Sequence, residues 1–183
     1  MMGIYTKKGD RGKTSNVLGH IYSKADMMME LQGSIDEVNA HVGQLRSLLK
    51  ENNTLLYNKI NDILKNIQYN LFVLGVEVSL EFTESKIKIC EAEKLEKEID
   101  AMTNEMEPLK NFIYQSGNLK ATSAHIIRSI VRRTERVFVR VLENREYPES
   151  YQYINRLSDY FFTLARYLNY VDKGEKEEIL IIK

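Results

Sequence analysis

The chain is organised around the stretch Arg128-Ser129-Ile130-Val131-Arg132-Arg133-Thr134-Glu135-Arg136, which lies within a helical pattern from about residue 119 to residue 144. On a helix that turns by about 100° per residue, Arg128, Arg132 and Glu135 share one narrow face because they are spaced i, i+4 and i+7. An apolar stripe beside this face is formed by Ile127, Ile130, Val131, Thr134, Val137, Phe138 and Val141. One side of this helix can therefore pack into a core while arginines line its edge, with Arg133, Arg136 and Arg140 on the far flank.

The arginine row is chemically suited to phosphate. A guanidinium presents its donors in a planar fork that matches phosphate oxygens. Glu135 can orient the arginines, or accept a hydrogen bond from a ribose hydroxyl or an amine. Arginines on helices are more often solvated or paired with nearby acids. The helix alone therefore leaves an anion site and a solvated face as alternatives.

Composition bounds the class of protein. The chain has 183 residues, 43% of them hydrophobic and 28% charged, and its formal net charge is zero. This length predicts one domain with a core of its own, and the zero net charge argues against a general nucleic-acid binder. The single cysteine, Cys90, excludes a disulfide within the chain and predicts a cytoplasmic setting. There is no N-terminal signal pattern and no apolar run near the roughly 18 residues of a membrane span, so no membrane association is expected.

Residues 1–24 are predicted to form an ordered, glycine-rich loop. Glycines at positions 3, 9, 12 and 19 disfavour a helix and leave backbone N–H groups unshielded. The basic and hydroxyl side chains between them are Lys7, Lys8, Arg11, Lys13, Thr14 and Ser15. Such a loop can cradle phosphate, and a basic tail without a ligand is the alternative. Gly12-Lys13-Thr14 is not a Walker loop, because that pattern needs a glycine where Lys7 stands.

Four further segments repeat apolar residues at spacings of three and four. This pattern predicts helices over about residues 25–50, 55–82, 90–106 and 150–172, the second of them capped by Thr54. The predicted fold is all-α, an up-and-down five-helix bundle within a single domain over residues 1–183. Residues 25–172 would form the bundle, and residues 173–183 a C-terminal tail that either pairs as a strand with residues 86–90 or docks on the bundle.

Two further places raise a functional alternative. Gly33 in the interior of the first helix costs about 1 kcal/mol relative to alanine, which a close approach by a neighbour or ligand would explain. Asp36, Glu37 and Asn39 form a polar cluster beside it, for which a solvated face is the simpler interpretation. Phe112, in the loop before the arginine helix, is either a plug on the core or a functional ring. No metal site is predicted, because the three histidines are scattered: His20, His41 and His125.

Four separated segments resemble the motifs of the PduO-type ATP:cob(I)alamin adenosyltransferases. The family's Tyr-Thr-basic-x-Gly-Asp-x-Gly-x-Thr-Ser/Thr resembles Tyr5–Ser15, and its Gly-Thr-x-Asp-Glu-Leu-Asn resembles Gly33–Asn39. Its Arg-x-x-x-Arg-Arg-Ala-Glu-Arg resembles Arg128–Arg136, with Thr134 in place of alanine. Its Leu-Asn-Arg-Leu-Ser-Asp resembles Ile154–Asp159. The four segments have the family's order and cover nearly the whole chain.

The chain departs from the family pattern at two places. Leu18–Tyr22 stands where a Gly-Glu-Arg stretch is common, and Tyr114–Gly117 stands where a Pro-Gly-Gly turn is common. The first departure affects the placing of Lys24, and the second affects the loop expected to face the corrinoid.

The resemblance implies a ferritin-like, cobalamin adenosyltransferase-like bundle that forms a homotrimer with active sites between subunits. On the side of the N-terminal nucleotide-binding loop, residues 1–24, ATP would be bound by Thr6, Lys7, Lys8, Gly9, Thr14, Ser15 and Lys24. On the helix side it would be bound by Arg132, Arg133, Glu135, Arg136 and Asn155. Asp36 would pair with Arg128 across the interface, and Phe112 would help to exclude the lower cobalt ligand.

The implied reaction transfers the 5′-deoxyadenosyl group of ATP to cob(I)alamin by attack of Co(I) on the ribose C5′, with Mg²⁺ on the phosphates and tripolyphosphate as the leaving group. Such a protein needs no side-chain nucleophile, only alignment and charge neutralisation. Its partners would include a corrinoid reductase and an adenosylcobalamin-dependent enzyme. The alternatives are a non-catalytic ATP- or corrinoid-binding carrier or sensor, and a helical interaction or nucleic-acid-binding protein that uses the arginine row.

Overall fold

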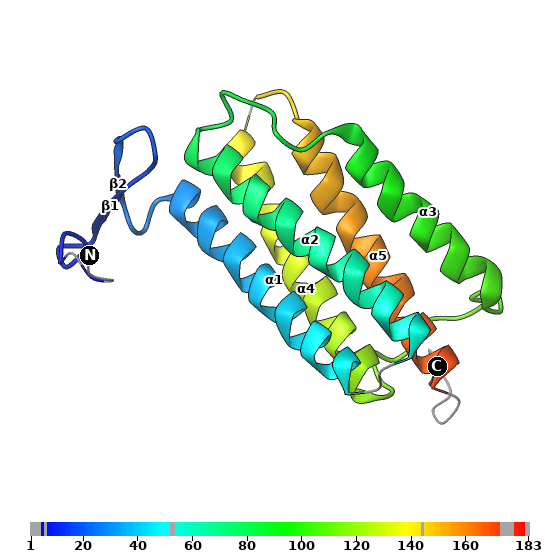
Figure 1. Cartoon of the computed structure of the whole chain (residues 1–183). Coiled ribbons are helices and arrows are strands. Elements are labelled where there is room, and N and C mark those ends of the chain that lie inside the picture. The colour runs from blue at the N-terminus through cyan, green and yellow to red at the C-terminus, as the bar shows by residue number, and fades with distance from the viewer. Residues whose placement is uncertain (1–4, 6, 52–53, 144, 173–177, 182–183) are drawn as a thin grey trace.

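Five segments with apolar residues at helical spacing form five α-helices in the computed structural model (Figure 1). The structure describes residues 5, 7–51, 54–143, 145–172 and 178–181. The helices are α1 (Met27–Lys50), α2 (Leu55–Ser79), α3 (Ile89–Glu105), α4 (Leu119–Leu142) and α5 (Glu149–Val171). The predicted all-α five-helix bundle is therefore confirmed.

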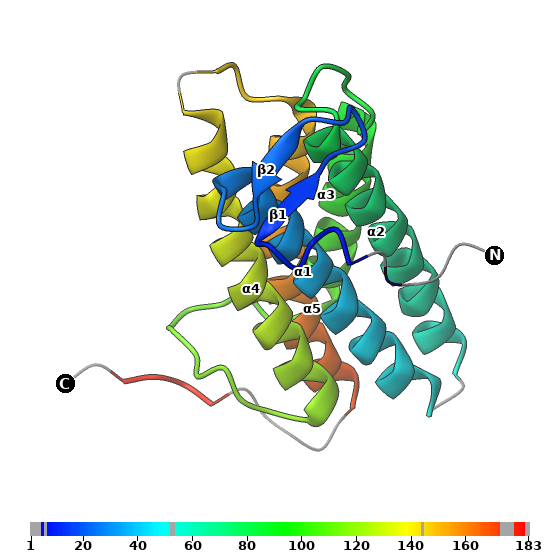
Figure 2. The same cartoon turned by 90° about the vertical axis from the view of Figure 1, so that its left-hand side faces the viewer.

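The arginine-bearing helix α4 forms one side of the bundle (Figure 2). It packs between α1 and α5, while α2 covers the other side of α1 and α3 covers the other side of α5 (Figures 1 and 2). The stripe predicted for α4 points into the core: Val131 and Phe138 are fully buried, and Val141 is partly buried. This packing leaves the flank that carries Arg132 and Arg136 exposed.

Side chains cap the N-terminal ends of α1, α2 and α4, whereas α3 and α5 begin without a side-chain cap. Thr54 accepts a hydrogen bond from the Tyr57 N–H, which confirms the predicted cap of α2. The predicted end of α2 at Phe82 is wrong, because the helix stops at Ser79. Glu81 and Phe82 take left-handed backbone conformations, with φ of 56° and 58°, and a helix cannot continue through them. The Phe82 ring stacks on Phe138 with 5.2 Å between ring centroids, which holds this corner against α4.

The N-terminal segment contains a short antiparallel hairpin. Strand β1 (Lys13–Ser15) pairs with β2 (Ile21–Ser23), and Thr14 lies opposite Tyr22. The hairpin projects from the bundle beside the start of α1 (Figure 1). Because a two-stranded hairpin is marginally stable in water, its order depends on contacts to the bundle.

The C-terminal tail docks on the loop before α4. Ile179 bridges Ile113, and the Tyr114 N–H donates to the carbonyl of Glu178 at 2.8 Å. The alternative of pairing with residues 86–90 is wrong, because the N–H groups of residues 86 and 87 already donate to the buried carboxylate of Glu77 at 2.5 and 2.6 Å. None of the helices in the described ranges is long and apolar enough to cross a membrane.

Candidate functional site

The N-terminal loop brings Gly9 and Lys24 together. The Gly12 N–H donates to the carbonyl of Gly9 at 3.2 Å, and the Lys24 N–H donates to the carbonyl of Gly12 at 2.9 Å. A Cβ at position 9 would lie 2.9 Å from the Lys24 Nζ, so the absent side chain leaves room for this ammonium. Two residues predicted to bind ATP thus form one cationic, backbone-lined surface.

The other loop residues predicted to bind ATP differ in their exposure. Lys7 and Lys8 are exposed, while Thr6 lies outside the described residues. Along β1, Lys13 and Ser15 are exposed and Thr14 is half-buried, because successive side chains of a strand point to opposite faces. The hairpin therefore presents a lysine and a hydroxyl on its outer face.

On α4, Arg128 and Arg132 lie close enough to influence each other. The Arg128 guanidinium sits over the Phe162 ring, 5.4 Å from its centroid. Partial burial and the neighbouring charge of Arg132 lower the pKa of Arg128, while Asp159 opposes this shift. Arg132 is exposed, so its fork is available to a ligand.

Arg133 differs from Arg132 and Arg136 in its contacts. Arg133 forms an ion pair with Glu37 of α1, which fixes its direction toward that helix. Arg132 and Arg136 have no hydrogen-bonded or ion-paired partner among the residues that the structure describes. Exposed like charges without counter-charges attract an anion.

Glu135 and Asn155, both predicted on the helix side, are in contact. The Asn155 Nδ2 donates to Glu135 Oε1 at 2.8 Å, and the Tyr151 hydroxyl donates to the same oxygen at 3.4 Å. Burial and the nearby Glu135 charge raise the pKa of Tyr151, so this phenol stays protonated at neutral pH. Sequence reasoning missed Tyr151, although its i, i+4 spacing to Asn155 places both on one face of α5.

Asp36 and Arg128 do not meet within one chain. Asp36 is exposed on α1, whereas Arg128 faces Phe162 of α5. No described atom lies within 4 Å of a Cβ built on Gly33, which is also exposed. The close approach expected at Gly33 and the pairing of Asp36 therefore stay predictions about a second copy or a ligand.

Phe112 is presented to solvent rather than packed as a plug on the core, because it is 70% exposed. The tail holds its loop on both sides of Ile113, where the Leu180 N–H donates to the carbonyl of Phe112 and the Tyr114 N–H donates to the carbonyl of Glu178, both at 2.8 Å. Asn169 of α5 holds the other end, accepting from the Asn118 N–H and donating to the carbonyl of Ser116, both at 3.1 Å.

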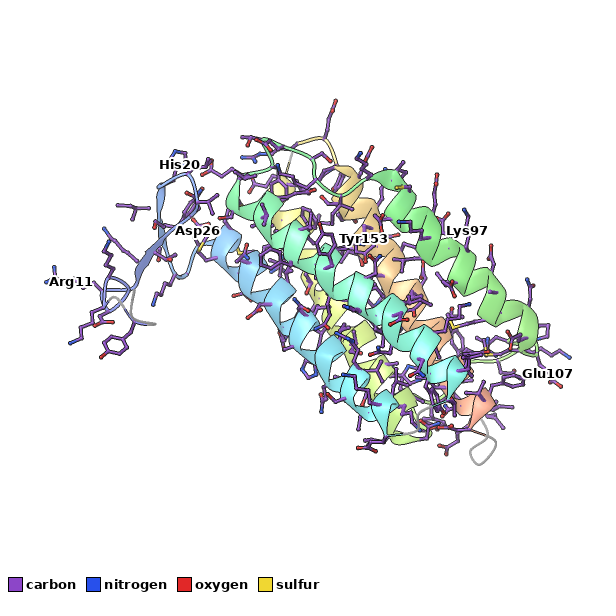
Figure 3. The ribbon with its side chains drawn as sticks, in the orientation of Figure 1. Arg11, His20, Asp26, Lys97, Glu107 and Tyr153 are labelled. Carbon is purple, nitrogen blue, oxygen red and sulfur yellow. The ribbon has the colours of Figure 1, made fainter. Side chains whose placement is uncertain are left out.

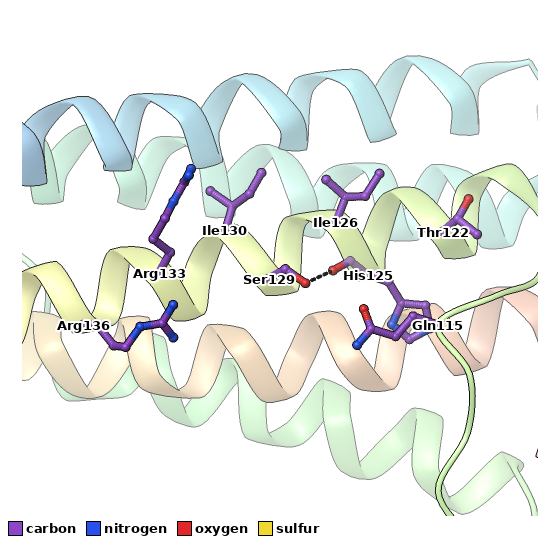
Figure 4. A pocket seen from close by; sticks show the side chains of 8 residues that line it. All are labelled: Gln115, Thr122, His125, Ile126, Ser129, Ile130, Arg133 and Arg136. Atoms are coloured by element: carbon purple, nitrogen blue, oxygen red, sulfur yellow. Dashed lines mark hydrogen bonds between the residues drawn. The ribbon is translucent and has the colours of Figure 1, made fainter. Parts of the chain in front are cut away.

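A surface pocket of about 470 Å³ follows α4 toward the arginines (Figure 4). Its lining residues are Gln115, Thr122, His125, Ile126, Ser129, Ile130, Arg133 and Arg136. The lining residues before Arg133 were not predicted from the sequence, although Thr122, Ile126 and Ser129 follow one another at helical spacing on the flank opposite the core. Within the described ranges, no three His, Cys, Asp or Glu side chains cluster closely enough to hold a metal ion.

One chain does not bring the loop and the arginine flank together. The hairpin, with Arg11 and His20, stands beyond the start of α1 (Figure 3), and its turn is tied to Ser79 and Glu81 at the end of α2. The arginines lie along the middle of α4, where Figure 4 shows Arg133 and Arg136. Each half is therefore open to a second molecule.

A family described as Cobalamin adenosyltransferase matches residues 4–168. A corrinoid adenosyltransferase of Bacillus subtilis is 37% identical over 171 residues, which cover 92% of this chain and 87% of that protein. A corrinoid adenosyltransferase of Homo sapiens is 33% identical over 184 residues, which cover 96% of this chain and 72% of that protein.

A solved structure gives the same result. It is a phenylalanine-to-alanine variant of a PduO-type ATP:corrinoid adenosyltransferase from Lactobacillus reuteri, complexed with cobalamin and ATP. Its TM-score is 0.88 at 32% identity, and the match covers 97% of this chain and 99% of that chain. The chain therefore belongs to the family of PduO-type cobalamin adenosyltransferases.

Proposed function

We propose that this protein transfers the 5′-deoxyadenosyl group of ATP to cob(I)alamin, giving adenosylcobalamin and tripolyphosphate. The observation that carries the proposal is the exposed pair Arg132 and Arg136, which have no partner in the described part of the chain and stand beside the Glu135–Asn155 pair. The Lactobacillus reuteri relative complexed with cobalamin and ATP supports it.

The reaction needs alignment and charge neutralisation more than acid–base chemistry. Co(I) supplies the electron pair that forms the Co–C bond, and the C5′–O bond breaks with its electrons going to tripolyphosphate. Arginine forks and the loop lysines hold the departing phosphates, and Mg²⁺ bound to ATP would supply further positive charge there. Glu135, fixed by Asn155 and Tyr151, keeps an oxygen free to accept from a ribose hydroxyl.

The active site forms between subunits of a homotrimer. Within one chain the hairpin lies apart from the arginine flank (Figure 1). Each carries exposed cationic side chains, and together they suit one polyphosphate. Asp36 and Gly33 are exposed on α1 beside α4, where a second copy would contact them. Asp36 then pairs with Arg128 of the neighbouring copy and fixes the shape of the site.

Phe112 acts on the corrinoid side. Its exposed ring and its doubly held loop suit a side chain that displaces the lower cobalt ligand. The exposed thiol of Cys90 fits a reducing, cytoplasmic setting. A corrinoid reductase supplies cob(I)alamin, and an adenosylcobalamin-dependent enzyme consumes the product.

Corrinoid absorbance tests the proposal. Purified protein with MgATP and chemically reduced cob(I)alamin, kept anaerobic, is expected to give the light-sensitive spectrum of an alkylcobalamin, and to do so only when both ATP and protein are present. ATP binding without any conversion would contradict the proposal and favour a carrier or sensor.

A further inference from the structure

One carboxylate at the end of α2 holds the N-terminal hairpin. Glu81 Oε1 accepts hydrogen bonds from Asn16 Nδ2 and the Tyr22 hydroxyl, both at 2.7 Å, and lies 2.5 Å from His20 Nδ1. Asn16 and His20 lie in the turn between the strands and Tyr22 lies in β2, so one residue next to α2 contacts both the turn and the second strand of the hairpin. The geometry is that of a latch, named here the Glu81 latch.

The turn of the hairpin is itself well ordered where it meets α2. Asn16 Oδ1 accepts from the N–H groups of Leu18 and His20, at 3.0 and 2.9 Å, so the turn keeps one shape. The Val17 N–H donates to Ser79 Oγ at 3.1 Å, which adds a second attachment beside Glu81.

The latch has a fixed base. Glu81 and Phe82 both occupy the left-handed region, which non-glycine residues adopt only where surrounding contacts hold them. The Phe82 ring provides that contact by stacking on Phe138, whose own side chain is fully buried. The Glu81 carboxylate is therefore held out from the bundle toward the hairpin.

The latch also decides which face of the hairpin points outward. Thr14 lies directly opposite Tyr22, and opposite residues of an antiparallel pair share a face of the ribbon. Because Tyr22 turns toward Glu81, Thr14 turns toward the bundle and is half-buried, while Lys13 and Ser15 face away. Without the latch, the hairpin would depend on the Val17–Ser79 hydrogen bond at its turn, which does not fix the face that it turns outward.

We propose that Glu81 is a positioning residue for ATP, which holds the hairpin so that Lys13, Ser15 and the loop with Gly9 and Lys24 meet the nucleotide in one orientation. The proposal rests on the function proposed above. Glu81 does not touch the reacting atoms. It raises the fraction of molecules whose loop is competent to bind, and the apparent affinity for ATP follows that fraction.

Steady-state kinetics of Glu81→Ala tests this role. If loss of the latch leaves about one molecule in ten with an ordered hairpin, the KM for ATP rises about tenfold, with kcat at saturating ATP within about twofold and the KM for cob(I)alamin unchanged. Glu81→Gln keeps an acceptor oxygen for Asn16 and Tyr22, so it is expected to recover most of the affinity. Glu84→Ala is the matched control, since this nearby exposed carboxylate pairs only with Lys86 among the described residues.

Hydrogen exchange measures the order of the hairpin separately from its effect on ATP binding. The amides of Asn16 and Lys24, which donate to His20 and Gly12, are expected to exchange faster in Glu81→Ala and at the wild-type rate in Glu84→Ala. Unchanged exchange would overturn the latch, and faster exchange with an unchanged KM would overturn its role in ATP binding. A reduced kcat that saturating ATP does not restore would also overturn it.

The same design separates this proposal from the proposed function. A wild-type protein that forms no alkylcobalamin would overturn the function and, with it, the role of the latch. An active wild type with an unaffected Glu81→Ala variant would overturn the latch alone. If Glu81→Ala loses helical circular dichroism, Tyr22→Phe and His20→Ala each remove one donor and decide the question by the same two measurements.

Discussion

Replacing Arg132 with alanine should abolish most of the adenosyl transfer without unfolding the protein. The guanidinium is exposed and has no hydrogen-bonded partner among the described residues, so its loss should change the free energy of unfolding by no more than about 0.5 kcal/mol. It also removes a like charge beside Arg128, whose pKa is lowered by burial and by Arg132. The structure therefore predicts a functional defect separate from stability.

The catalytic magnitude follows from the loss of one charge-assisted donor at the leaving group. Removing one such donor in a preorganised site costs about 10²–10³ in kcat, or roughly 3–4 kcal/mol of transition-state stabilisation. Arg132→Lys keeps the charge but loses the planar fork, so its activity should lie between the alanine variant and the wild type.

The assay is anaerobic conversion of cob(I)alamin at saturating MgATP, followed by absorbance, with thermal unfolding measured alongside. Arg140→Ala is the matched control, because Arg140 is exposed on the same helix and has no assigned role. Turnover by Arg132→Ala within about threefold of wild type would refute the assignment. So would an equal loss in Arg140→Ala, which would point to a general effect of helix charge.

Three further outcomes are expected. Phe112→Ala, which replaces a ring that is 70% exposed, should impair turnover from cob(II)alamin with a reductant more than from pre-reduced cob(I)alamin; equal effects would remove its assigned role. Gly117→Ala should destabilise the fold by about 2–4 kcal/mol in urea, because φ is +117° there and the new Cβ would lie 2.0 Å from Asn169 Oδ1; an unchanged midpoint would show that the loop relaxes freely. For Asp172, burial opposes ionisation. The 2.8 Å ion pair with Lys120 and the hydrogen bond from the Tyr57 hydroxyl nevertheless hold its pKa below the usual 3.8. The ionised Asp172 therefore stabilises the fold above pH 3.8, and this stabilisation is lost as the pH falls through the lower folded pKa. Asp172→Asn should lower the free energy of unfolding by about 1–2 kcal/mol at pH 7 and leave it unchanged at acid pH. A deficit that persists at acid pH would contradict the linkage.

Local signals predicted the helices well. The stripe of α4, from Ile127 to Val141, depends only on spacing along one helix, and the Thr54 cap depends only on its next few residues. Glu135 and Asn155 were both predicted at the site because they lie in segments that resemble one family's motifs, but the hydrogen bond between them was not predicted.

Long-range contacts explain what sequence reasoning missed. Nothing near Phe82 in the sequence indicates that α2 ends early, since the corner at residues 81–82 is held by a ring on α4. The sequence did not show which segment the tail would pair with. The N–H groups of residues 86–87 donate to Glu77 of α2, and the tail pairs instead with the loop before α4. The Glu81 latch joins residues about 60 positions apart at a segment, Leu18–Tyr22, that departs from the family pattern.

In the proposed enzyme, the loop of one copy and the arginine flank of another form the site. The most direct test co-expresses Lys24→Ala and Arg132→Ala chains under different affinity tags and purifies assemblies through both tags. Each variant alone should be nearly inactive, whereas each mixed trimer should contain one intact site of three and show about one third of wild-type activity. Mixed assemblies no more active than the separate variants would contradict the claim and place both groups in one subunit.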